Sequence, residues 1–189
     1  GTFLTEVDWP KTWGFPFELY RPLFMTLREN RLEGIALNVP KAIVHKVARE
    51  GFESLSEEER RSVPAGMSRT ADAPYLAMLR ETFLQHGGDP QDARAFGRYL
   101  DAMTLWNEGM ASRVAGYAAS HPGTKVVVFA GMFHAYDAGI PESVRRRLPG
   151  IAQTGVILTE ADSCPSALPP GSLSLSSDLV WVMTRARRF

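Results

Sequence analysis

The sequence predicts an α/β protein in which a mostly parallel sheet is flanked by helices and carries a helical insertion. Short apolar runs have the length and composition of buried strands, and amphipathic helical patterns lie between them. A strand followed at once by a helix is typical of a βα unit, which favours parallel pairing. The predicted strands are 33–39, 125–130, 152–160 and 178–184, and the insertion spans about 53–120.

Composition restricts the possible classes of protein. A chain of 189 residues fits one domain over 1–189. Its 21 basic and 21 acidic residues cancel, so net charge does not favour nucleic acid or an anionic membrane as a partner. A single cysteine, Cys164, excludes an internal disulfide and a cysteine-rich zinc site. We find no apolar run of about 20 residues that would span a bilayer, and no Walker, GxGxxG, GxSxG or HExxH motif.

Helix-breaking residues and hydrophobic periodicity predict the N-terminal elements. Residues 8–16 combine aromatic side chains with Pro and Gly, which predicts an ordered loop held down by Trp9 and Trp13. A helix with Pro22 in its first turn is expected to run to Asn30.

After the first strand, residues 41–50 place their apolar side chains on one side and end at a glycine, which predicts a helix. Ser56 and Glu59 have the spacing of a capping box at the start of a short helix. Two longer helices are predicted at 73–86 and 89–120. Beyond them come a short basic helix ending at Arg147 and a surface loop at about 162–177.

His134 is the first candidate functional residue. It follows the 125–130 strand, and ligands of open α/β sheets gather beyond the carboxyl ends of strands. Histidine is a common metal ligand and proton carrier near neutral pH. A structural role, in which the ring hydrogen-bonds to a loop backbone, is an equal alternative.

Tyr75 and His86 form the second candidate site. They are eleven residues apart, about three helical turns, so both side chains can point the same way. An apolar groove edged by a tyrosine or histidine suits haem, because either side chain can be an axial ligand. The alternative is that this aromatic and methionine stripe packs in the core.

Other polar residues are interpreted as solvated. Asp101 and Glu108 lie seven residues apart and can share one face of the long helix, where carboxylates usually face water. His45 and His121 have polar neighbours and are expected at the surface. Surface positions are also expected for the basic residues Arg145, Arg146, Arg147, Arg185, Arg187 and Arg188.

Several segments, in order, resemble the ChaN-like haem-binding uptake family over residues 8 to about 160. The N-terminal ones are Asp8-Trp9, Trp13-Gly14, Gly34-Ile35-Ala36-Leu37-Asn38-Val39-Pro40 and Val47-Ala48-Arg49-Glu50-Gly51. The later ones are Leu105-Trp106-Asn107-Glu108-Gly109-Met110-Ala111 and Ala130-Gly131-Met132-Phe133-His134, followed by Gly139-Ile140-Pro141. Asn107 stands where the family often has aspartate.

The resemblance implies an α/β core shared with the erythromycin-esterase, TraB and Tiki proteins. It implies a role in haem binding and iron uptake, at a periplasmic or outer-membrane-associated site of the cell envelope. It further implies a tyrosine ligand and a homodimer that sandwiches haem. On this basis Tyr75 and His86 are the best ligands, and the insertion helices form the cradle. Tyrosines at other positions leave the choice of ligand open: Tyr20, Tyr99, Tyr117 and Tyr136.

Two further functions stay open. Gly131 and His134 match the GxxH that Tiki and TraB relatives use with glutamates for metal-dependent hydrolysis, which implies a divalent metal at His134. A third possibility is an inactive, partner-binding α/β module. The family begins with a strand and a Gly-Glu-x-His type motif upstream of these residues, so we expect an N-terminally truncated chain in which a hydrolase would lack its glutamates.

Overall fold

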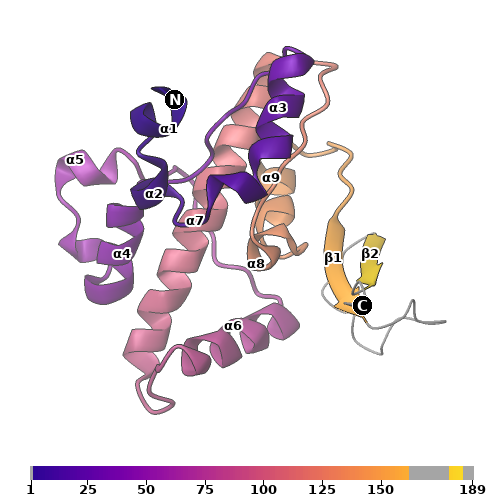
Figure 1. The fold of residues 1–189 in the computed structure, drawn as a ribbon. Coiled ribbons are helices and arrows are strands. Elements are labelled where there is room, and N and C mark those ends of the chain that lie inside the picture. The colour runs from indigo at the N-terminus through magenta and orange to yellow at the C-terminus, as the bar shows by residue number, and fades with distance from the viewer. Residues whose placement is uncertain (1, 162–178, 185–189) are drawn as a thin grey trace. The chain divides into compact units, whose positions relative to one another are not determined.

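The computed structural model describes residues 2–161 and 179–184, which are mostly helical (Figure 1). The chain divides into two units, Gly1–Ala36 and Leu37–Phe189, and each is described by itself. The first unit contains α1 (Thr2–Glu6), α2 (Trp9–Thr12), the 3-10 helix η1 (Phe17–Leu19) and α3 (Arg21–Glu29). The second contains α4 (Lys41–Glu50), η2 (Phe52–Ser54), α5 (Glu57–Arg60), α6 (Ala73–Gln85), α7 (Ala93–Ser120), α8 (Met132–Ala135), α9 (Ile140–Arg147), β1 (Val156–Ala161) and β2 (Leu179–Thr184). The predicted surface loop at 162–177 lies outside the described residues.

The predicted α/β fold with a mostly parallel sheet is wrong. Among the described residues, only β1 and β2 form a sheet; they pair in parallel, with Val156 opposite Leu179. The segments 33–39 and 125–130 form neither a strand nor a helix. A strand requires a hydrogen-bonded neighbour, which sequence pattern alone does not supply.

The 125–130 segment nevertheless keeps the side-chain alternation of a strand. Val128 and Ala130 pack against the helical core, whereas Val127 and Phe129 are 76% and 65% exposed. The strand prediction therefore located the apolar face correctly but not the pairing. The surface formed by the outward side chains is apolar.

The first unit is built around aromatic side chains. Trp9 is buried, and its ring contacts those of Trp13, Phe17, Tyr20 and Phe24. The predicted loop over 8–16 is wrong at its start, because Trp9–Thr12 forms the helical turn α2. The expectation that the two tryptophans hold this segment in place is confirmed by their packing.

The second unit is organised by α7, which lies against α4, α6 and α9. Three apolar clusters surround this helix, and Trp106 packs against all of them. The helix begins at Ala93, capped by Asp92, four residues later than predicted. The predicted capping box of Ser56 and Glu59 is confirmed. No helix in the described ranges is both long and apolar enough to cross a membrane.

Gly109 lets α7 approach the backbone before α4. A Cβ built at Gly109 would lie 2.2 Å from Cγ2 of Val39, whereas a Cβ at Gly116 would meet nothing within 4 Å. We expect Gly109→Ala to lower the free energy of unfolding by about 1–3 kcal/mol through overpacking. Gly116→Ala, the matched control, should raise it by about 0.5–1 kcal/mol because alanine favours a helix. Urea unfolding of both variants tests this, and equal effects at the two sites would contradict it.

Candidate functional site

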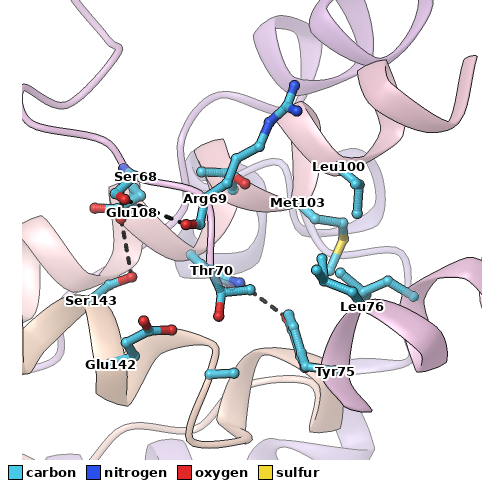
Figure 2. Close-up of a pocket in the computed structure, with 14 residues that line it drawn as sticks. Ser68, Arg69, Thr70, Tyr75, Leu76, Leu100, Met103, Glu108, Glu142 and Ser143 are labelled. Atoms are coloured by element: carbon cyan, nitrogen blue, oxygen red, sulfur yellow. Dashed lines mark hydrogen bonds between the residues drawn. The ribbon is translucent and has the colours of Figure 1, made fainter. Parts of the chain in front are cut away.

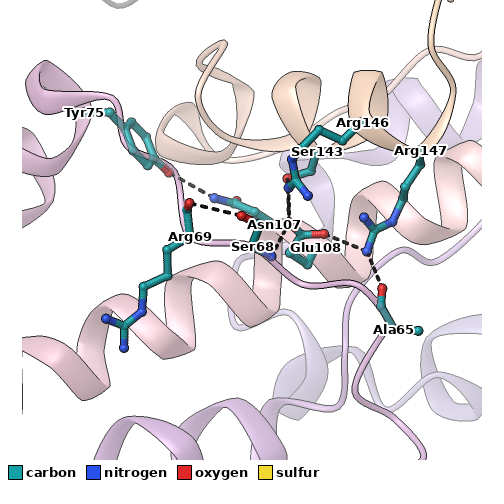
Figure 3. A network of polar contacts seen from close by, with 9 residues as sticks. All are labelled: Ala65, Ser68, Arg69, Tyr75, Asn107, Glu108, Ser143, Arg146 and Arg147. Atoms are coloured by element: carbon teal, nitrogen blue, oxygen red, sulfur yellow. Dashed lines mark hydrogen bonds and ion pairs between the residues drawn. The ribbon is translucent and has the colours of Figure 1, made fainter.

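Tyr75 lies inside the second unit and links three elements. It sits in the first turns of α6, is 1% exposed, and its hydroxyl donates to the carbonyl oxygen of Phe133 in α8 at 2.8 Å. The same hydroxyl accepts a hydrogen bond from Asn107 Nδ2 of α7 at 3.1 Å (Figure 3). Burial raises the pKa of Tyr75 to about 12, so the neutral phenol is the form present near neutral pH.

His134 joins the same network through Asn107. Its Nδ1 lies 2.7 Å from Asn107 Oδ1, and its ring meets the edge of Trp106 with centroids 5.5 Å apart. Burial lowers the pKa of His134 to about 4, so the imidazole is neutral near pH 7. Tyr75, Asn107 and His134 therefore form one hydrogen-bonded chain across α6, α7 and α8.

Glu108 is the centre of a second polar network, one residue further along α7. It is 0% exposed, and its Oε1 accepts from Ser68 N at 3.3 Å, from Ser143 Oγ at 3.2 Å and from Arg146 (Figure 3). Oε2 lies 2.7 Å from Arg147 Nη2. That contact is an ion pair but lacks hydrogen-bond geometry, so among the described residues Oε2 has no hydrogen-bond donor.

This arrangement corrects the solvated interpretation of Glu108 and of Arg147, whereas Arg145 and Arg146 are exposed, as predicted. Glu108 is buried and pairs with both Arg146 and Arg147, whose side chains are 34% and 16% exposed. A buried carboxylate needs such partners because its desolvation costs several kcal/mol. Asp101 does lie nearer the surface, where it binds Arg69. The prediction for Arg185, Arg187 and Arg188 concerns residues outside those described.

A small cavity adjoins both networks. It measures about 20 Å³, and Tyr75, Asn107 and Glu108 line it together with Arg69 and Thr70 (Figure 2). A volume of this size holds about one water molecule when polar groups surround it. The cavity is thus too small for haem.

His86 does not join Tyr75. It is exposed at the C-terminal end of α6, where its Nδ1 lies 2.7 Å from the carbonyl oxygen of Thr82. The two predicted haem ligands therefore occupy different surroundings, one inside the core and one at the surface. His45 and His121 are exposed, as predicted.

The described residues contain no group of three or more His, Cys, Asp or Glu side chains that could hold a metal ion. The hydrogen-bonded partner of His134 is an amide, and that amide binds a phenol. The predicted metal at His134 thus has no carboxylate ligand set in this part of the chain.

The polar networks contain two residues that the sequence did not single out, Ser68 and Ser143. Asn107 could be selected, because it belongs to the family-like run and is a polar side chain on the apolar stripe formed by Met103, Met110 and Val114. Ser68 and Ser143 carry no comparable signal, because each comes from a segment far away in the sequence. Only folding brings them to Glu108.

Together these features define a helix-rich chain whose second unit is arranged around one long helix, with two buried polar networks and an exposed histidine at a helix end. The chain belongs to the family described as haem-binding uptake, Tiki superfamily, ChaN, whose sequence profile matches residues 1–144. Searches of the curated proteins and of the solved structures gave no significant match. The resemblance inferred from the sequence motifs is therefore confirmed.

Proposed function

We propose that this chain binds haem for uptake, with His86 as the iron ligand at the end of α6. Membership of the haem-binding family supports haem as the ligand. The observation that carries the choice of residue is the combination of the hydrogen bond between His86 Nδ1 and the carbonyl oxygen of Thr82, at 2.7 Å, with the aromatic cluster that begins at Phe83.

That hydrogen bond determines which nitrogen can bind iron. A carbonyl oxygen only accepts, so Nδ1 must carry the proton and Nε2 must hold the lone pair. A histidine whose Nδ1–H donates to a backbone carbonyl has its ring oriented for metal ligation through Nε2. The residue is exposed, so a planar ligand can reach it without disturbing the core.

Aromatic side chains next to His86 supply an apolar surface. Phe83 precedes it by about one helical turn, and its ring lies 5.5 Å from that of Phe96 and 5.6 Å from that of Tyr99. Arg80 covers the Phe96 ring at 5.0 Å. A haem placed here would contact aromatic rings, and a guanidinium is suited to a propionate. A bound haem would supply an iron centre, and His86 Nε2 would hold it.

Tyr75 is assigned a different role in this proposal. A tyrosine binds iron best as a phenolate, but the Tyr75 hydroxyl is buried, neutral and hydrogen-bonded to Phe133 and Asn107. We propose that it holds α6 against α8, so that α6 presents His86 at its far end. Loss of the hydroxyl should then weaken packing without removing the iron ligand.

Haemin titration followed by absorbance tests this assignment. The unmodified chain should give a saturable Soret shift, which His86→Ala should reduce at least tenfold in affinity and Tyr75→Phe should leave in place. His121→Ala is the matched control, because His121 Nδ1 also lies near the carbonyl four residues earlier, Tyr117 O, at 3.0 Å. An unchanged titration in His86→Ala, or a loss in His121→Ala alone, would contradict the proposal.

We also propose that two copies of the chain form a homodimer that covers the bound haem. An exposed haem face is apolar, and contact with a second copy would remove that face from water. Light scattering of the same samples should show a mass that doubles as haem is added. A monomer at saturating haem would exclude the dimer and leave the assignment of His86 intact.

A further inference from the structure

We propose that Asn107 is a positioning residue that holds His134 in the tautomer protonated on Nδ1, leaving Nε2 unprotonated and able to accept a hydrogen bond. This inference goes beyond haem binding and does not depend on it. It concerns the chain of hydrogen bonds that runs from Phe133 through Tyr75 and Asn107 to His134.

The direction of each hydrogen bond follows from one backbone carbonyl. The Phe133 oxygen can only accept, so the single proton of the Tyr75 hydroxyl must point to it at 2.8 Å. The hydroxyl then accepts from Asn107, which places Nδ2 of the amide 3.1 Å from Tyr75. The amide oxygen is thereby turned toward His134, and Nδ1 at 2.7 Å must donate to it.

Packing keeps the imidazole in this position. The edge contact with Trp106 limits rotation of the ring. The backbone is restrained as well, because Gly139 lies so close that a Cβ there would be 2.5 Å from the His134 carbonyl oxygen. Because neither the ring nor the backbone of His134 can move freely, the ring keeps the same hydrogen-bond partner. The donor and the acceptor are fixed in each bond of the chain, so His134 keeps one tautomer.

The result is a neutral imidazole with one available lone pair. The described residues provide no hydrogen bond to His134 Nε2, and this atom is not among the fully buried unpartnered atoms of that part of the chain. An unprotonated ring nitrogen of this kind accepts a hydrogen bond or a proton from a hydroxyl. Asn107 acts through His134 and need not touch the ligand.

Nitrogen-15 NMR of the histidine side chains tests the inference directly, because imidazole spectra distinguish the two tautomers. The unmodified chain should show His134 only in the Nδ1-protonated form, with its signals identified by their loss in His134→Gln. Asn107→Leu removes the acceptor at similar size and should give a mixture of tautomers. Tyr75→Phe removes the hydroxyl that directs the amide and should also give a mixture.

Ser143→Ala is the matched control, since Ser143 belongs to the neighbouring Glu108 network and should leave the His134 tautomer unchanged. If Asn107→Leu does not fold, Tyr75→Phe still tests the inference, because this substitution keeps the aromatic ring and removes only the hydroxyl. An Nε2-protonated His134 in the unmodified chain, or a single Nδ1-protonated form in both folded variants, would overturn the inference. Neither result bears on the haem titration.

Discussion

Replacing Glu108 with alanine is expected to lower the free energy of unfolding by about 3–5 kcal/mol, the usual loss when one partner of a buried ion pair is removed. The side chain is 1% exposed and contacts Ser68, Ser143, Arg146 and Arg147. Without it, Arg146 and Arg147 keep their charge beside a cavity, and the Ser143 hydroxyl loses its acceptor. Urea or guanidinium unfolding at pH 7 measures the change.

Asp101→Ala is the matched control in the same helix. Asp101 also pairs with an arginine, but its side chain is 22% exposed and that of Arg69 is 53% exposed. A surface ion pair contributes about 0–1 kcal/mol, so this variant should change little. Equal losses in the two variants would show that Glu108 contributes no more than a surface carboxylate.

The second large effect is an acid-induced loss of stability that originates at His134. Its pKa is about 4 in the folded chain and near 6.5 when exposed, so the unfolded chain binds the proton more tightly between these values. The contribution of the neutral His134 ring to the free energy of unfolding is fully present above pH 6.5. It falls as the pH drops toward 4. The loss should be on the order of 3 kcal/mol.

Denaturant unfolding at several pH values, compared between the unmodified chain and His134→Gln, isolates this contribution. Carboxylates titrate in both proteins, so only the difference in slope belongs to His134. His121→Gln replaces an exposed histidine and should keep the slope of the unmodified chain. A parallel pH dependence in His134→Gln would mean that His134 is not the source.

The helices could be predicted because their signals are local. The apolar faces of 41–50 and 73–86, and the capping box at Ser56, act within one or two turns of the chain. Of the predicted strands, 152–160 and 178–184 correspond to β1 and β2, but the larger sheet that was expected could not be predicted in the same way. Residues 125–130 have the composition of a strand, but pairing depends on a neighbour in space that composition does not reveal.

The candidate site shows the same division. His134 and the run from Trp106 to Glu108 could be selected from the sequence, the histidine for its chemistry and the run for its likeness to the family. Their relation could not, because Asn107 meets His134 across 27 positions and Tyr75 across 32. Such contacts depend on how α6, α7 and α8 pack.

The sequence by itself determined the helical periodicity, the family and the set of side chains able to bind or carry protons. The tertiary structure alone decided that Glu108 is buried between two arginines and that Tyr75 directs Asn107 toward His134. It also decided that His86 stays at the surface. The physical reason is that helix formation depends on neighbours three and four positions away. Burial and hydrogen-bond direction depend instead on partners that only folding brings together.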